Sequence, residues 1–136
     1  MSVLGIGVDL VHVPSFAEQL ALPGSRFADV FTPGERRDAA DGATRHAGGP
    51  ARHLAARWAA KEALVKAWSA SLFGSPPLMG DEALGQVEVV RDAWDRPRLR
   101  LHADVARHLA GLETHLSLSH DGDHAVAYVV LTRPVR

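Results

Sequence analysis

A run of alanines is the feature that most constrains how this chain can fold. Between residues 51 and 70, alanine recurs every few positions among only a few larger apolar side chains. Alanine has the highest helix propensity, and small side chains let a helix approach a neighbouring sheet closely. We therefore expect one long helix over residues 51–70. Lys61 and Glu62 lie next to each other in the middle of it.

The N-terminal segment predicts a strand with two different faces. Residues 3–13 alternate so that aliphatic side chains share one face, while Gly5, Gly7 and Asp9 share the other. Two glycines on one face leave room for another element to approach the backbone. Aspartate is depleted in strands, and a buried carboxylate needs a cationic partner. Asp9 is thus expected to meet a lysine, an arginine or a metal ion.

The remaining pattern predicts an α+β fold in a single domain spanning residues 1–136. Thr32, followed by Pro33 and Glu35, has the form of a capping box at a helix start. We expect a mostly antiparallel sheet packed on one long helix. The other expected elements are helices over 15–20 and 103–110, strands over 86–92, 96–102, 115–121 and 124–132, and loops over 41–50 and 73–80.

Composition excludes several classes of function. The chain has no cysteine, which rules out disulfides, thiolate zinc sites and cysteine nucleophiles. With 15 basic and 16 acidic residues, the net charge of -1 provides no overall attraction to nucleic acid or to a membrane surface. The apolar N-terminus lacks a basic flank and is too short to span a bilayer. We expect a cytoplasmic protein with neither nucleic-acid nor membrane partners.

The chemistry of Glu62 has two interpretations at this point. In the first, Glu62 forms an exposed pair with Lys66 one helical turn later, which contributes only about 0.2–0.5 kcal/mol. In the second, Glu62 points inward on the face that also carries Trp58, and it joins Asp9 at a divalent cation. Mg²⁺ is commonly held by one or two carboxylates together with phosphate oxygens.

Ser119 and His120 stand at the end of a predicted strand, beside a turn. Neighbours on a strand point to opposite faces, so the two do not form a catalytic dyad. The histidine either binds a phosphate or is only part of a hairpin, and the residues alone leave both interpretations open.

Three segments together resemble the bacterial holo-acyl-carrier-protein synthases, the small class of 4′-phosphopantetheinyl transferases. They are GIGVDLV near the start, FTPGE followed by ARWAAKEALVKAW in the middle, and SLSHDGDHAVAYVV near the end. The resemblance covers essentially the whole chain and implies the fold of that family. It also implies transfer of 4′-phosphopantetheine from coenzyme A to a serine of apo acyl-carrier protein, with release of adenosine 3′,5′-bisphosphate, for fatty acid biosynthesis.

The resemblance also implies roles for residues of the central motif. Asp9 and Glu62 match the positions that bind Mg²⁺, with Mn²⁺ as a possible substitute. Lys61 would add positive charge where the transferred phosphoryl group develops negative charge. Glu62, or a metal-held water that it orients, is the candidate general base.

Four further residues are expected to contact coenzyme A. Arg57 and Lys66 would face its phosphates, with helix solubility as the alternative role. Ser119 and His120 would approach the phosphates from a neighbouring subunit. The resemblance therefore implies a homotrimer with active sites at its interfaces. It leaves open whether the acyl-carrier protein is free or is a domain of a larger synthase.

Two rival functions use the same residues differently. A metal-dependent phosphohydrolase would consume coenzyme A without any carrier protein. A non-catalytic oligomeric binding module would keep Asp9 and Glu62 in structural salt bridges and would need no Mg²⁺. The joint occurrence of the three segments favours the transferase over both.

Overall fold

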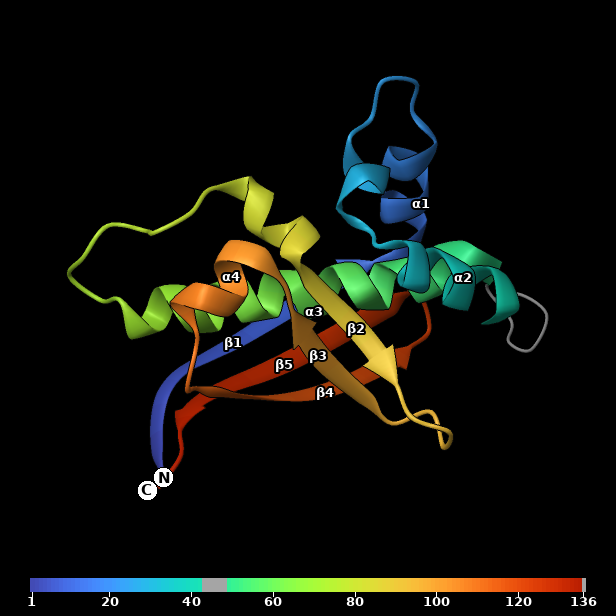
Figure 1. The fold of residues 1–136 in the computed structure, drawn as a ribbon. Coiled ribbons are helices and arrows are strands. Elements are labelled where there is room, and N and C mark those ends of the chain that lie inside the picture. The colour runs from blue at the N-terminus through green and yellow to red at the C-terminus, as the bar shows by residue number, and fades with distance from the viewer. Residues whose placement is uncertain (43–48, 136) are drawn as a thin grey trace.

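The computed structural model describes residues 1–42 and 49–135. Figure 1 shows one long helix, α3, lying across a three-stranded sheet, with a two-stranded hairpin crossing on the other side of the helix. The elements are β1 (Ser2–His12), α1 (Val13–Ala21), the 3-10 helix η1 (Phe27–Val30), α2 (Pro33–Gly42), α3 (Gly49–Ser71), the 3-10 helix η2 (Asp81–Gln86), β2 (Val87–Arg91), β3 (Pro97–Leu101), α4 (Ala103–His108), β4 (Glu113–Asp121) and β5 (His124–Arg133).

The strands form two antiparallel sheets, which confirms the expected α+β class. One sheet has the order β1-β5-β4 and the other pairs β2 with β3. The strands were expected in a single sheet, but among the described residues β2 and β3 pair only with each other. Of the loop expected over 41–50, residues 43–48 lie outside the described part of the chain, and its two ends belong to α2 and α3.

The backbones of β1 and α3 are in direct contact through the two glycines of the strand. A Cβ added at Gly5 would overlap the carbonyl group of Ala67, and one added at Gly7 would overlap that of Ala63. The space predicted beside Asp9 is therefore filled by the helix itself. This contact fixes α3 against the sheet at the point where Asp9 leaves the strand.

Helix α3 is surrounded by other elements over most of its circumference. It packs on β1 and β5 below, and on α2, β2 and η2 on the other side. An apolar helix surface on all sides is typical of a helix in the centre of a fold. No helix in the described ranges is long and apolar enough to cross a membrane. The buried residues of α3 are Ala55, Ala56, Arg57, Ala59, Ala60, Lys61, Ala63, Leu64, Ala67 and Trp68.

A buried ion pair joins α2, α3 and β2. The Lys61 ammonium lies 2.8 Å from Oε1 of Glu35, and both side chains are fully buried. Lys61 also donates to the carbonyl oxygens of Leu84 and Val87. Glu35 closes the predicted capping box, since Thr32 N donates to Glu35 Oε1 at 3.0 Å and Glu35 N donates to Thr32 Oγ1 at 3.2 Å. The same carboxylate thus caps one helix and neutralises a cation on another.

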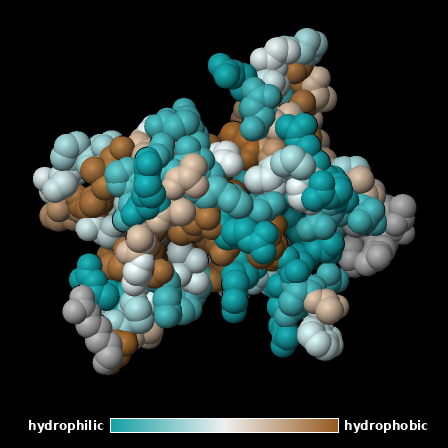
Figure 2. Space-filling view, in the orientation of Figure 1, coloured by the Kyte–Doolittle hydropathy of each residue, from teal (hydrophilic) through white to brown (hydrophobic). Residues whose placement is uncertain are grey.

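The outer face of the three-stranded sheet is not covered by any described element. Ile6 and Leu10 are 59% and 65% exposed, and Tyr128 on the adjoining strand is 53% exposed. These side chains point away from α3, because the alternate residues of β1 and β5 are buried against it. Figure 2 shows a further group of hydrophobic residues over the loop that follows α3, where Phe73 is 98% exposed.

The glycine contact gives a stability prediction. Gly7→Ala should lower the free energy of unfolding by about 1–3 kcal/mol or more, because the new methyl group forces α3 away from β1. Gly85→Ala is the matched control, since an added Cβ there meets no atom within 4 Å. Urea unfolding at one protein concentration measures both. Equal midpoints for the two variants would contradict the close contact.

The buried pair gives a second prediction. Lys61→Met should cost about 3–5 kcal/mol, because it leaves the buried Glu35 carboxylate without its counter-charge. Lys66→Met on the same helix should cost less than about 1 kcal/mol, because the Lys66 side chain is 53% exposed. The double variant Glu35→Gln/Lys61→Met should recover part of the loss. If its loss of unfolding free energy, measured with urea, equals the sum of the losses in Glu35→Gln and Lys61→Met alone, the two side chains are not coupled.

Candidate active site

Three charged side chains meet where β1 crosses α3. Asp9 leaves the glycine-bearing face of β1, and Lys66 reaches it from α3 with Nζ 3.0 Å from Asp9 Oδ1. The same ammonium donates to the carbonyl oxygen of Val8 at 3.0 Å. Glu62 lies one helical turn before Lys66, and its carboxylate interacts electrostatically with Asp9 and with Lys66. The cationic partner expected for Asp9 is thus Lys66, and Glu62 lies nearby.

Burial raises the pKa of Glu62, and repulsion from Asp9 raises it further, while Lys66 acts in the opposite direction. Glu62 is half-buried and lines a pocket of about 700 Å³ between η1 and η2, whose apolar wall includes Trp58 and Phe27. These two rings stack with their centroids 4.6 Å apart. A carboxylate with a raised pKa beside an open pocket is suited to accept a proton.

The pair Asp9 and Glu62 fits a divalent cation. Hard cations such as Mg²⁺ take carboxylate oxygens and retain several positions for water or phosphate. The repulsion between the two carboxylates shows that the site favours positive charge, which Lys66 supplies in part. Among the described residues no cluster of three or more acidic or histidine side chains surrounds a single point. The protein therefore offers two ligands there, and a phosphate ligand would supply others.

Lys61, for which a catalytic role was predicted, lies apart from this site. Its ammonium is fully buried on another side of α3 and has three oxygen partners, from Glu35, Leu84 and Val87. Burial lowers the pKa of Lys61, and the Glu35 carboxylate opposes that change. The neighbour of Glu62 in sequence is therefore part of the core, and the lysine beside the carboxylates is Lys66.

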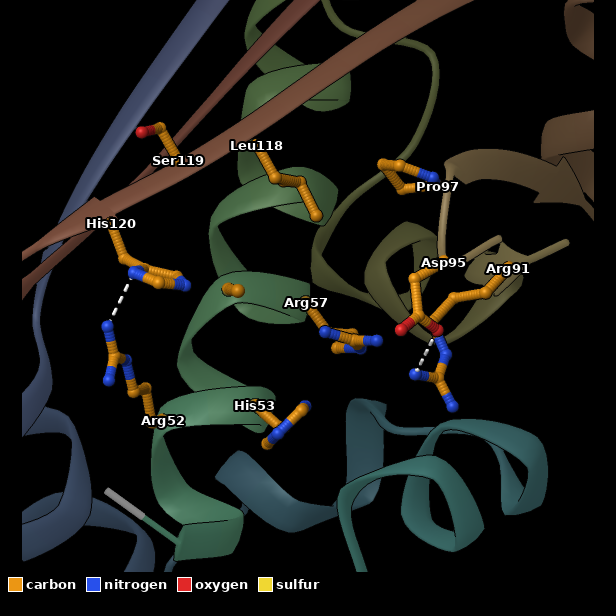
Figure 3. Close-up of a pocket in the computed structure, with 10 residues that line it drawn as sticks. Arg52, His53, Arg57, Arg91, Asp95, Pro97, Leu118, Ser119 and His120 are labelled. Atoms are coloured by element: carbon orange, nitrogen blue, oxygen red, sulfur yellow. Dashed lines mark hydrogen bonds and ion pairs between the residues drawn. The ribbon is translucent and has the colours of Figure 1, made fainter. Parts of the chain in front are cut away.

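A second, cationic pocket of about 540 Å³ lies between α3, the end of β4 and the β2–β3 hairpin. Figure 3 shows guanidinium and imidazole groups from these elements pointing into it. The Asp95 carboxylate is the acidic group of its lining. The residues that line it are Arg52, His53, Ala56, Arg57, Arg91, Asp95, Pro97, Leu118, Ser119 and His120.

Arg57 is the most buried cation of this pocket, with 6% of its surface exposed. Burial lowers the pKa of Arg57, and the nearby Arg91 lowers it further. Its Nε finds no acceptor among the described residues. Buried polar groups are nearly always hydrogen-bonded, so this Nε is an unsatisfied donor on a buried cation beside the pocket.

The two predicted β4 residues differ in orientation. His120 points towards Arg52, with Nη2 of the arginine 2.5 Å from Nδ1 of the histidine (Figure 3). Because a guanidinium only donates, Nδ1 accepts and the proton of the neutral ring lies on Nε2. The Ser119 hydroxyl points away from Arg57 in Figure 3. His120 is thus placed to donate to an anion in the pocket.

The carboxylates and the cationic pocket lie on opposite sides of α3. Glu62 follows Arg57 by five positions, which turns its side chain by about 140° around the helix axis. No residue of the described ranges lines both pockets. Within one copy of this chain, the helix therefore separates the two halves of the predicted site.

Several pocket residues were not predicted from the sequence. His53 stands one turn before Arg57, so helical spacing could have indicated it. Arg91 and Asp95 come from the hairpin, and only the folded chain brings them to α3. Residues 69–71 form the last turn of α3, and Ser71 Oγ donates to the Trp68 carbonyl oxygen.

Comparison with known proteins identifies the family. Residues 5–129 match the 4′-phosphopantetheinyl transferase superfamily. The chain is 51% identical over 134 residues to the holo-[acyl-carrier-protein] synthase of Mycolicibacterium paratuberculosis, covering 98% of this chain and 100% of that one. Its fold resembles the solved Mycobacterium tuberculosis acyl carrier protein synthase (TM-score 0.79, 48% identity, 97% and 99% of the chains).

A second solved structure, a complex with coenzyme A from Chronobacterium ammoniagenes, has a TM-score of 0.84 and 44% identity over 96% of this chain and 98% of that one. The sequence match and the fold match each extend over nearly the whole chain. This protein belongs to the 4′-phosphopantetheinyl transferase superfamily.

Proposed function

We propose that this protein transfers the 4′-phosphopantetheine group of coenzyme A to a serine of an apo acyl-carrier protein. The observation that carries the proposal is the meeting of Asp9, Glu62 and Lys66 at the crossing of β1 and α3. Relatives about 50% identical over the whole chain are holo-[acyl-carrier-protein] synthases, and a structural relative holds coenzyme A. These relatives support the same substrates here.

In the proposed reaction, the serine oxygen of the carrier attacks the β-phosphorus of coenzyme A. The bond from that phosphorus to the bridging oxygen breaks, and adenosine 3′,5′-bisphosphate leaves with the electron pair. Glu62, or a water that it orients, takes the serine proton. Lys66 lies beside the diphosphate and compensates the charge that grows on the leaving phosphate.

Asp9 and Glu62 hold Mg²⁺ in this proposal. When bound, the ion would draw negative charge from the diphosphate oxygens. Mn²⁺ has similar oxygen ligands and is a possible substitute. The carboxylates are kept in place by the protein itself, because Asp9 is fixed by the contact between β1 and α3 and Glu62 by the helix.

The cationic pocket is assigned to the phosphomonoester of coenzyme A, since the diphosphate is assigned to the carboxylates and their cation. Arg57 offers its guanidinium and His120 its Nε2 proton. Ser119, which points away from Arg57, is kept as a proposed contact to another part of the ligand. Arg57 and Lys66 thus serve different phosphates of one ligand.

A second copy of the chain completes the site in this proposal. The two pockets face opposite sides of α3, so one copy cannot offer both to the same ligand. The bare sheet face with Ile6, Leu10 and Tyr128 provides an apolar surface for association. We propose a closed homotrimer, in which each coenzyme A bridges the carboxylates of one subunit and the cationic pocket of the next.

The proposed setting is fatty acid biosynthesis in the cytoplasm. The relatives named above act on acyl-carrier proteins, and such carriers hold growing acyl chains on the phosphopantetheine arm. Helix α1 contains Glu18 and no lysine or arginine, so it offers no positive charge to attract an acidic carrier protein. The carrier is either a free protein or a domain of a larger synthase.

Transfer is tested by intact mass spectrometry of an apo carrier mixed with this protein, coenzyme A and Mg²⁺. One added phosphopantetheine, lost with chelator, is the expected result. Glu62→Gln and Asp9→Asn should lower kcat by about 10²–10⁴-fold, because each removes a group that acts on the proton or the charge. Asp9→Asn should also weaken Mg²⁺ binding measured directly by calorimetry.

Glu82→Gln is the matched control for these variants. Glu82 lines the same pocket as Glu62, and its carboxylate accepts hydrogen bonds from nearby backbone nitrogens, those of Gly80 and of Glu82 itself. Its kcat should stay close to that of the unaltered protein. Full transfer by folded Glu62→Gln would contradict the assignment, and loss of coenzyme A without a carrier would favour the phosphohydrolase.

Sharing of the site between subunits predicts complementation. Asp9→Asn damages the carboxylates and Arg57→Gln damages the cationic pocket, so either variant alone should be inactive. Unfolding and refolding the two together in equal amounts should restore about one quarter of the activity, because random neighbours combine two intact halves in that fraction of interfaces. Absence of any recovery in mixed assemblies confirmed by native mass spectrometry would contradict a shared site.

A further inference from the structure

Asp95 occupies an unusual position in the hairpin between β2 and β3. Its φ is 63°, in the left-handed region that costs most residues energy, although aspartate and asparagine adopt it more readily. The turn itself is held by a different residue. The Asp92 carboxylate accepts from the backbone nitrogens of Trp94 and Arg96 and from Arg96 Nε. The Asp95 carboxylate is therefore available for another role.

That carboxylate is bound to one edge of Arg91 in the cationic pocket. The Asp38 carboxylate of α2 lies 3.4 Å from Nε and 3.3 Å from Nη2 of the Arg91 guanidinium. Asp95 Oδ1 accepts a hydrogen bond from Nη1 at 2.8 Å. The two partners differ in burial, since the Asp38 side chain is 29% exposed and the Asp95 side chain is 62% exposed. Asp38 orients Arg91 from behind, and Asp95 covers the edge that faces the pocket.

Asp95 also lies next to Arg57. Figure 3 shows its carboxylate between the guanidinium groups of Arg57 and Arg91. Arg91 and Asp95 both act on the charge of Arg57: Arg91 repels it as a like charge, and Asp95 attracts it as an opposite one. The Asp95 carboxylate is thus paired with Arg91 and lies next to Arg57, at a place where a phosphate would have both cations within reach.

We propose that Asp95 is an internal competing anion: it holds the phosphate position between Arg57 and Arg91 in the ligand-free protein and is displaced by the phosphomonoester of coenzyme A. This inference rests on the proposed function. A phosphomonoester carries close to two negative charges at neutral pH and three acceptor oxygens, so it replaces a single carboxylate favourably. The exposed position of Asp95 lets it swing out of the pocket.

The competition has a purpose in turnover. The product adenosine 3′,5′-bisphosphate keeps the same phosphomonoester and would remain bound if the two arginines were free. Return of the Asp95 carboxylate to Arg91 favours release of that product. Asp95 therefore lowers the affinity for substrate and product alike, and it determines how strongly the product inhibits the reaction.

The test compares the affinities of three ligands for the full-length protein by calorimetry. They are coenzyme A, adenosine 3′,5′-bisphosphate and 3′-dephospho-coenzyme A. In Asp95→Asn, which keeps the left-handed turn, the first two should bind about two- to fivefold more tightly, the range expected for a partly exposed ion pair. The dephospho compound should be unchanged, because it leaves Asp95 in place. Asp95→Gly should behave in the same way.

Two controls separate competition from a general effect of charge. Asp104→Asn removes one negative charge from an ion pair with Arg107 on α4, away from the pocket lining, and should leave all three affinities unchanged. Asp38→Asn removes the other carboxylate of Arg91 and should weaken binding of the phosphomonoesters, because Arg91 loses its orientation. The product should also inhibit transfer more strongly in Asp95→Asn than in the unaltered protein.

Unchanged or weaker binding of the phosphomonoesters in both Asp95 variants would overturn the proposal. Equal tightening of 3′-dephospho-coenzyme A would overturn it too, because a general gain of positive charge would then explain the result. Failure of the transfer reaction is a separate outcome. A protein that binds the bisphosphate but transfers nothing would contradict the proposed function, while the Asp95 comparison could still be read from the bisphosphate.

Discussion

Backbone contact between β1 and α3 sets the geometry on which the rest of the molecule depends. Gly5 and Gly7 allow the carbonyl groups of the helix to lie against the strand, at a separation that any Cβ would prevent. Asp9 is two residues beyond the second glycine on the same face, so its carboxylate emerges at the surface of α3 beside Lys66. The chemistry at this crossing is therefore a direct consequence of how closely two elements pack.

The other side of α3 is held by charge in addition to apolar packing. Lys61 is fully buried, and its ammonium joins the Glu35 carboxylate to carbonyl oxygens of η2 and of the first residue of β2. The Glu35 carboxylate also accepts a hydrogen bond from Val89 N at 3.0 Å, and it completes the cap of α2. A buried pair of this kind is costly to desolvate, and it specifies one arrangement because few alternatives satisfy both charges. The adjacent residues Lys61 and Glu62 thus serve the core and the candidate site, respectively.

Much of the fold followed from local patterns, because these depend on neighbours in sequence. The alanine helix, the glycine face of β1 and the capping box at Thr32 were each predicted and are confirmed. The position of Lys61 was not predicted, since neither its burial nor its pairing with Glu35 is visible in helical spacing. Arg91 and Asp95 were not found for a similar reason. They reach the pocket only because the hairpin crosses α3, a tertiary relation between segments that share no local pattern.

In the proposed trimer, the position of the two pockets on opposite sides of α3 has a consequence for how activity responds to protein concentration. When the active site lies within one chain, activity falls in proportion to the protein concentration. A site assembled from two chains disappears when the chains separate, so activity falls more steeply than concentration near the dissociation constant of the assembly. The amount of this protein in a cell would then act as a threshold for the modification of its carrier.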